Sequence, residues 1–243
     1  MLLNDGLERL HLQGKELLSK PDFPLSLERL NLVSYNLNDK DFSSLTNLKK
    51  ISLHSNNGFE GLEFPENIED ISFNIDRYNG NGVGINLDYS HLSQLKNVRV
   101  EGGSFDQTGL VFPVSLEYLI FSSPVAGNND YSYLHNLKTF ETNAAFERLP
   151  ALPSSLTKLQ MQYFTLTADA TMDLSNLTNL TYIYLYASQP ADQPITLILP
   201  TNLSEAAVQA HRFSINNYST FFLPAGSTII NKPSWFDQYA TYY

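Results

Sequence analysis

The chain of 243 residues contains no cysteine, one tryptophan and three methionines. The absence of cysteine excludes disulfide bonds, thiolate catalysis and cysteine-based zinc sites. Basic residues are also scarce. The 15 Lys and Arg against 25 Asp and Glu give a formal net charge of −10, which argues against general nucleic-acid binding. No run of about 18 apolar residues occurs, so the sequence predicts no membrane insertion.

Arrangements typical of active sites are missing as well. The histidines form no His-x-His or His-x-x-x-His pair; they are His11, His54, His91, His135 and His211. No metal site is therefore expected. A glycine-rich stretch at residues 80–84 is not followed by Lys-Ser/Thr, and no Gly-x-Ser-x-Gly sequence occurs. We expect no catalytic residues, no cofactor and no enzymatic activity.

What the chain does contain is one spacing repeated ten times: an aliphatic residue, two variable residues, an apolar residue, one variable residue and usually a third apolar residue. The copies read Leu7-Leu10-Leu12, Leu27-Leu30-Leu32, Leu48-Ile51-Leu53, Ile68-Ile71-Phe73, Leu95-Val98-Val100, Leu116-Leu119-Phe121, Leu137-Phe140-Thr142, Leu156-Leu159-Met161, Leu180-Ile183-Leu185 and Leu203-Ala206-Val208. Their starts lie 19 to 27 residues apart. Units this short cannot bury an apolar side alone, so they must stack and share one core.

This period predicts one solenoid of about ten rungs over residues 1–219. A solenoid exposes its core at each end and needs caps. Apolar and aromatic residues such as Trp235, Phe236 and Tyr239 crowd the last segment. We therefore expect a C-terminal cap at residues 220–243.

Two kinds of repeat alternate along the chain. Proline-type units lead into their strand through an aromatic residue or Leu followed by Pro, as at Phe64-Pro65. Aspartate-type units begin at Asp41, Asp88, Asp130 and Asp173. An Asp ahead of a short apolar turn can cap free backbone amides, so these residues are expected to cap brief helical turns. Matched positions in alternate repeats favour a structural role over a catalytic one.

These repeats resemble those of leucine-rich repeat proteins over nearly the whole chain, and the aspartate-type units, especially residues 173–186, resemble bacterial internalin-type repeats. The resemblance implies an α/β-type solenoid. It would be a right-handed superhelix with a parallel concave β-sheet and little helix on the convex side. It favours a secreted or cell-surface location, with a cytoplasmic one left open. The family's asparagine, eight residues after the first Leu, is matched only at Asn56, with Asp76 as a substitute in one further repeat. The exit turns should therefore be bonded differently.

Alternate positions of each strand should point outward onto the concave face in three columns. Tyrosine and arginine dominate binding hot spots because they bury large areas while keeping hydrogen-bonding groups. The main candidate partner-binding residues are Tyr118, Gln160, Gln162, Tyr182, Tyr184 and Tyr186. A second candidate is a basic patch on the first rungs, formed by Arg9, His11, Arg29, Lys50 and His54.

This pattern indicates that the protein recognises a macromolecule. A partner protein is the favoured ligand, and the protein would act in interactions of a bacterium with its host. A carbohydrate-binding, lectin-like module is the alternative, because tyrosine faces stack on sugar rings. A more remote alternative is a β-helix enzyme that degrades polysaccharides. That fold uses three strand segments per coil, whereas each repeat here has one clear strand signature.

Overall fold

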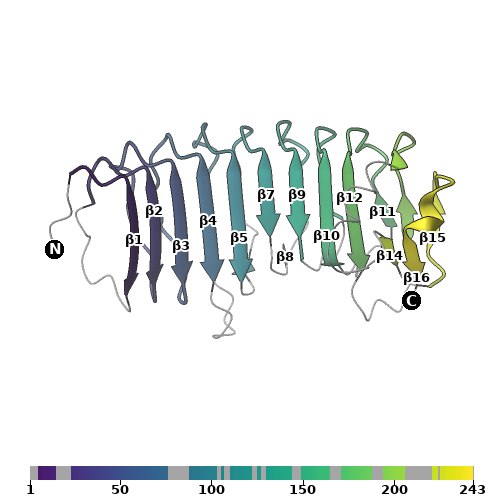
Figure 1. Cartoon of the computed structure of the whole chain (residues 1–243), viewed down its shortest axis with the longest axis horizontal. Coiled ribbons are helices and arrows are strands. Elements are labelled where there is room, and N and C mark those ends of the chain that lie inside the picture. Colours follow the sequence, from purple (N-terminus) through teal and green to yellow (C-terminus); the bar gives the residue numbers. More distant parts are fainter. Residues whose placement is uncertain are drawn as a thin grey trace. The chain divides into compact units, whose positions relative to one another are not determined.

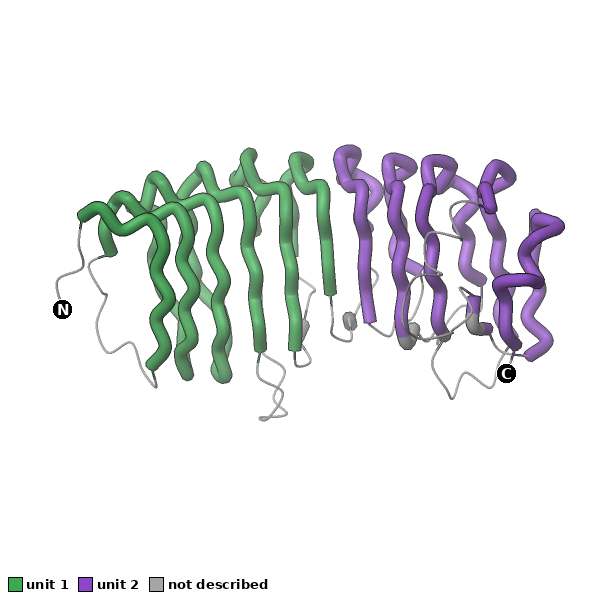
Figure 2. Tube along the Cα trace, in the orientation of Figure 1, with its two compact units in different colours: residues 1–123 green, residues 124–243 purple. Residues whose placement is uncertain are grey.

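The computed structural model describes residues 5–14, 23–75, 88–102, 105–106, 110–121, 125–126, 130–143, 149–164, 171–187, 194–205, 221–223 and 225–242. The chain forms two compact units, residues 1–123 and residues 124–243 (Figure 2). Each unit is a parallel β-solenoid, and a 3₁₀ turn at Phe236–Gln238 (η2) is the only complete helix within the described ranges (Figure 1).

Unit 1 is built on six parallel strands, each hydrogen-bonded to the next along the chain. They are β1 (Arg9–Gly14), β2 (Arg29–Ser34), β3 (Lys50–Ser55), β4 (Asp70–Ile75), β5 (Asn97–Gly102) and β7 (Tyr118–Phe121). The short strand β6 (Phe105–Asp106) lies outside this sheet. Each main strand alternates apolar and polar residues, so one face enters the core and the other stays open.

Unit 2 contains two parallel sheets. The larger consists of β9 (Thr139–Thr142), β10 (Lys158–Phe164), β12 (Tyr182–Ala187), β14 (Phe221–Leu223) and β16 (Ala240–Tyr242). The smaller consists of β11 (Thr171–Asp173), β13 (Thr196–Ile198) and β15 (Thr228–Ile230). The short strand β8 (Val125–Ala126) belongs to neither. The smaller sheet was not predicted, since only one strand signature per repeat was recognised.

The predicted strand register is confirmed within each unit. In unit 1 the first outward column pairs in the order Arg9, Arg29, Lys50, Asp70, Asn97 and Tyr118. In unit 2 Thr139, Lys158 and Tyr182 pair in the same way. The inward repeat residues from Leu27 to Leu185 are all buried. Those of the first strand, Leu10 and Leu12, are only half-buried.

The core of unit 1 contains a run of aromatic side chains contributed by successive repeats. Phe42 stacks on Phe64 at 6.0 Å between ring centroids, and Tyr89 lies 5.9 Å from Phe64 and 6.3 Å from Phe73. All four side chains are buried. Since Phe42 and Tyr89 each follow the Asp of an aspartate-type unit, this position supplies a large core side chain.

The aspartate-type units form single turns closed by bonds between residues i and i+3, instead of the expected helical turns. In one such unit the amide of Leu45 donates to the carbonyl of Phe42, and that of Leu48 donates to Leu45. The predicted capping is present, because a carboxylate oxygen accepts the amide two residues later at 2.8 to 2.9 Å. The pairs are Asp41 with Ser43, Asp88 with Ser90, Asp130 with Ser132 and Asp173 with Ser175.

A polar ladder joins neighbouring repeats at the residue just before the first Leu or Ile of each strand signature. There an Asn amide or Ser hydroxyl donates to a backbone carbonyl of the preceding repeat at 2.6 to 2.9 Å. The donors are Ser26, Asn47, Asn67, Ser115, Ser155, Asn179 and Asn202. These hydrogen bonds between repeats therefore lie at the entrance to the strand.

Some predicted features fall elsewhere or lie outside the described residues. The strand paired with β12 is β14 at Phe221–Leu223, and Glu205 of the proposed tenth copy is helical. Most of that copy, like the glycine-rich stretch 80–84, lies outside the described residues. Residues 221–242, expected as a cap, contribute strands β14, β15 and β16 to the two sheets.

Candidate functional site

The outward face of unit 2 holds a connected cluster of side chains from three adjacent strands, which we call the Tyr182 cluster (Glu141, Lys158, Gln160, Tyr182 and Tyr184). Lys158 Nζ lies 2.6 Å from Glu141 Oε1 and 4.9 Å from the centre of the Tyr182 ring, an ion pair and a cation–π contact. The Tyr182 hydroxyl lies 3.5 Å from Gln160 Oε1. The strand register places these side chains together, because β10 pairs with both β9 and β12.

Burial raises the pKa of Tyr182 to about 12, with smaller contributions from the nearby Glu141 carboxylate and Tyr184. The phenol is therefore protonated across the physiological range and acts as a hydrogen-bond donor or acceptor. It is unsuited to deliver a phenolate nucleophile near pH 7.

The prediction that Tyr184 is exposed is wrong. Its position in the outward register is as predicted, since it pairs with Gln160 while Ile183 and Leu185 enter the core. Yet its side chain is only 7% exposed. The flanking Tyr182 and Tyr186 are partly exposed. Strand β12 therefore offers two accessible tyrosine rings, those of Tyr182 and Tyr186.

The remaining predicted binding residues are divided between the units. Gln162 pairs with Tyr186 on the outward face of unit 2 and is partly exposed. Tyr118 belongs to β7 of unit 1, where it is 42% exposed. The structure therefore groups Gln160, Gln162, Tyr182 and Tyr186 on two paired strands and places Tyr118 in the other unit.

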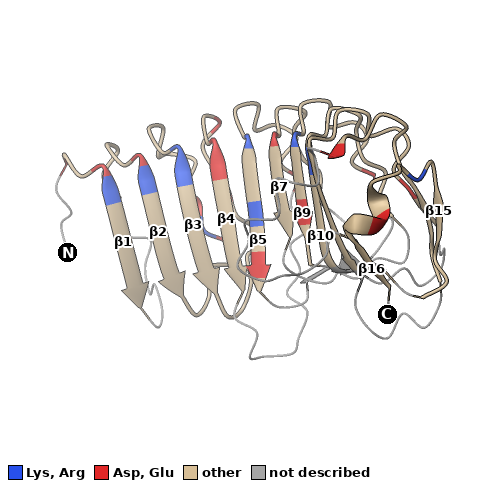
Figure 3. Ribbon diagram, turned by 45° about the vertical axis from the view of Figure 1, so that its right-hand side comes forward, with Lys and Arg blue, Asp and Glu red and all other residues tan. Residues whose placement is uncertain are grey.

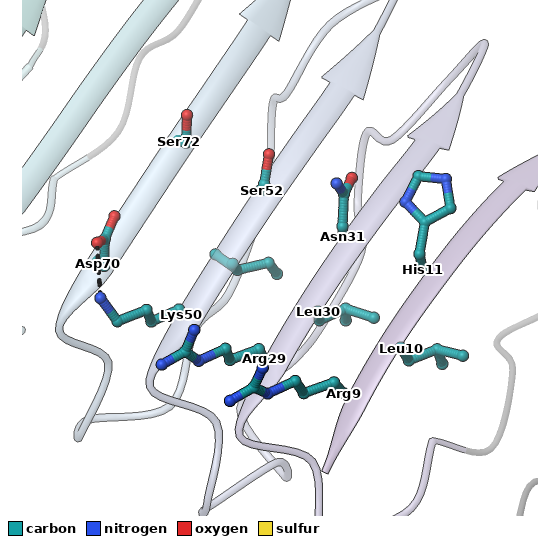
Figure 4. Close-up of a pocket in the computed structure, with 11 residues that line it drawn as sticks. Arg9, Leu10, His11, Arg29, Leu30, Asn31, Lys50, Ser52, Asp70 and Ser72 are labelled. Atoms are coloured by element: carbon teal, nitrogen blue, oxygen red, sulfur yellow. Dashed lines mark hydrogen bonds and ion pairs between the residues drawn. The ribbon is translucent and has the colours of Figure 1, made fainter. Parts of the chain in front are cut away.

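Unit 1 carries an open hollow of about 500 Å³ across β1, β2, β3 and β4 (Figure 4). It is lined by Arg9, Leu10, His11, Arg29, Leu30, Asn31, Lys50, Ile51, Ser52, Asp70 and Ser72. Four of the five residues of the predicted basic patch therefore line one surface feature. The fifth, His54, lies on β3 but does not line the hollow.

One side of the hollow is a row of cations, Arg9, Arg29 and Lys50, which we call the basic ladder. Figure 3 shows the basic residues at the start of β1, β2 and β3, followed by an acidic one at the start of β4. Lys50 Nζ lies 3.3 Å from Asp70 Oδ2. Within the described ranges, the guanidinium groups of Arg9 and Arg29 have no ion pair or hydrogen bond. Their charges are therefore available to a ligand.

Three members of the second outward column, Asn31, Ser52 and Ser72, form the bottom of the hollow, which we call the polar floor; His11, which pairs with Asn31, is the fourth lining member of that column. The side chains of the polar floor are much shorter than those of the basic ladder, so the surface is recessed beside the cations (Figure 4). The floor offers hydroxyl and amide groups, which can donate and accept hydrogen bonds.

Sequence reasoning missed the acidic members of both sites. Glu141 and Asp70 stand in the predicted columns, but only aromatic and basic residues were selected from them. A signal was present, since opposite charges at directly opposite or diagonal positions of paired strands predict cross-strand ion pairs. Lys50 and Asp70 are directly opposite in the first column. Lys158 is opposite Thr139 and therefore diagonal to Glu141, which is in the second column.

The parts of the chain that the structure describes contain no group of three His, Asp or Glu side chains placed to hold a metal ion. They also contain no helix with the length and apolar character needed to cross a bilayer. Comparisons of the chain with protein-family models, with curated proteins and with solved structures found no match.

Proposed function

We propose that this protein is a non-catalytic recognition scaffold whose sheet face binds a partner protein. The observation that carries the proposal is the register of the outward columns. Side chains recur on successive strands about 4.8 Å apart, so each unit presents an ordered surface independent of its buried residues. Such a surface is the usual binding element of solenoid proteins.

The Tyr182 cluster is the proposed anchor. The Tyr182 ring lies beneath the ion-paired Lys158 and its hydroxyl lies 3.5 Å from Gln160, so binding a partner would immobilise little additional side-chain freedom. Lys158 covers one face of the Tyr182 ring, which favours contact with a protein over stacking of that face on a sugar. The carbohydrate-binding alternative then depends on Tyr186.

We further propose that the solenoid is of the leucine-rich repeat type, right-handed and with the sheet on its concave side. The support is the spacing of the repeats, because each repeat has one long strand and places three apolar side chains in the core. Secretion or display on a cell surface follows from the same resemblance and is part of the proposal.

The test is partner capture with the full chain as bait, followed by affinity measurement with the captured protein. Replacing both Tyr182 and Tyr186 with Ala should weaken binding at least about 30-fold, the usual effect of losing an anchor residue. Tyr35→Ala is the matched control, because Tyr35 is 46% exposed and lies outside the strands. Tyr184 is avoided, since truncating a buried ring would destabilise the unit.

Unchanged affinity in the double variant would contradict the proposal that the Tyr182 cluster anchors the partner. Binding to an arrayed glycan, lost in Tyr186→Ala and without any captured protein, would favour the carbohydrate-binding alternative. Turnover of a peptide or polysaccharide, abolished by a single substitution, would contradict a non-catalytic role.

A further inference from the structure

The basic ladder of unit 1 is an unfavourable arrangement in the isolated protein. Arg9 and Arg29 lie directly opposite each other on paired strands, as do Arg29 and Lys50. Like charges at such positions destabilise a sheet. The chain has 25 acidic residues, yet in the described ranges only Asp70 pairs with this row. Local features that conflict with stability are most often found at functional sites.

The side chains of the ladder share one orientation. In Figure 4 Arg9, Arg29 and Lys50 all lean across the strands toward Asp70, so their charged groups form a line parallel to the columns. A ligand that neutralises them must carry its anionic groups along that line. It must also enter the recess above the polar floor of Asn31, Ser52 and Ser72.

We propose that this hollow binds an α-helix of a partner protein through acidic residues spaced at positions i, i+4 and i+7. This inference rests on the proposed role in protein recognition and specifies a partner element for unit 1. The helix would lie across the strands, with its acidic face on the basic ladder and its adjoining face over the polar floor.

The spacing of the cations favours a helix over an extended segment. Three rungs place the first and third cation about 9.6 Å apart along the column. Residues i and i+7 of a helix are separated by about 10.5 Å along its axis. In an extended chain, three side chains on one face span four residues, or about 13 Å. The helix therefore matches the ladder to about 1 Å, whereas the extended chain exceeds it by more than 3 Å.

The outward face of the sheet is also wide enough for a helix. The first and third outward positions of a strand, such as Lys50 and His54 on β3, lie four residues apart, or about 13 Å. A helix with its side chains is about 10–12 Å in diameter. Short side chains between them, such as Ser52, leave room for it.

The lining of the hollow argues against a polysaccharide as its occupant. No Tyr, Trp or Phe is among the lining residues, so the flat aromatic surface that stacks on sugar rings is missing here. The recognition elements are guanidinium and ammonium groups, which pair with carboxylates.

The test uses the full chain and two stapled, fluorescein-labelled helical peptides of identical composition. One peptide carries three Glu at i, i+4 and i+7; the other carries the same Glu distributed around the helix. Fluorescence anisotropy should show tighter binding of the first peptide at about 20 mM salt and clear weakening at about 200 mM. Arg29→Gln should weaken it about fivefold. Lys49→Gln, an identical charge change beside the ladder, should leave affinity unchanged.

Equal binding of the two peptides, or an equal effect of Arg29→Gln and Lys49→Gln, would overturn the inference. Displacement of the peptide by heparin at a lower concentration, with the same dependence on Arg29, would assign the hollow to an anionic glycan and also overturn it. These outcomes leave the proposed function intact if partner capture still depends on Tyr182 and Tyr186. Peptide binding that depends on Arg29, together with failed capture through the Tyr182 cluster, would instead remove only the proposed anchor.

Discussion

Tyr89 places its hydroxyl group in the buried core of unit 1. The side chain is 2% exposed, and its oxygen has no partner within the described residues. Burial raises the pKa of Tyr89 well above its ordinary value, so the group remains a neutral phenol. The ring itself packs well, between Phe64 and Phe73. Burial of the hydroxyl therefore costs desolvation energy, and no hydrogen bond in the described core offsets this cost.

Tyr89→Phe should raise the free energy of unfolding by about 1 kcal/mol, because it removes the unsatisfied oxygen and keeps the ring. Urea denaturation of the two proteins measures the difference. Tyr239→Phe is the control, since that buried hydroxyl lies 2.8 Å from Glu205 Oε1 and its removal should be destabilising. A stability loss in Tyr89→Phe as large as that in Tyr239→Phe would show that the Tyr89 hydroxyl is satisfied.

At the scale of single residues, the side of the sheet could be predicted from the sequence but the exposure could not. Alternation placed Tyr184 outward because Ile183 and Leu185 must enter the core. Its burial depends on the size of neighbouring side chains from other strands, which the local sequence pattern does not give. The same limit hid the contact between Lys158 and the Tyr182 ring.

At the scale of elements, the aspartate turns link the solenoid to solution pH. Hydrogen bonds from the side chain and backbone of the serine two residues later lower the pKa of Asp88, Asp130 and Asp173 below the ordinary value. A lowered native pKa stabilises the fold above the unfolded-state value, and this contribution disappears as the pH falls through the native value. The turns should therefore weaken in acid, below about pH 4.

Replacing Asp88, Asp130 and Asp173 together with Asn should reduce the loss of stability between pH 7 and pH 3. Asn keeps the acceptor oxygen and is an equally good cap, but it does not titrate. Urea unfolding at both pH values measures the difference. A control with the same change in net charge replaces Glu60, Glu63 and Glu66 with Gln. If both triple variants lose their acid sensitivity equally, net charge is responsible and the turns are not.

The long strands were predictable because three buried residues fix both their position and their register. A one-residue slip would turn every apolar side chain outward. The smaller sheet of β11, β13 and β15 escaped prediction because its strands have three residues each, too few to show alternation. The aspartate turns were expected to be helical because an Asp cap suits a helical turn and an i, i+3 turn equally well. The capping residue alone therefore does not distinguish the two conformations.

At the scale of the whole molecule, stability in stacked repeats depends on each repeat and its neighbours. Among the strands that the structure describes, β1 of unit 1 pairs only with β2, and its inward Leu10 and Leu12 are half-buried. The inward residues of β3, Ile51 and Leu53, are 2% and 0% exposed between two neighbouring strands. Unit 1 should therefore be least stable at β1.

Native-state hydrogen exchange should show this difference directly. The amides of β1 should exchange at least about tenfold faster than those of β3, because a local opening of β1 breaks a single strand interface. The amides of β4 provide an internal reference, since that strand also lies between two partners. Equal protection of β1 and β3 would mean that unit 1 opens only as one cooperative body.

The polar ladder at the strand entrances has a consequence for how such a chain can change over generations. Its donors are Asn or Ser side chains, but every acceptor is a backbone carbonyl of the preceding repeat. A backbone carbonyl is supplied by any amino acid, and both kinds of repeat supply donors and acceptors. A gene segment encoding one repeat can therefore be duplicated or deleted, and the new neighbours will still form these hydrogen bonds. Copy number and surface chemistry are free to drift separately, so descendants of one ancestral array can differ in length and in what they bind.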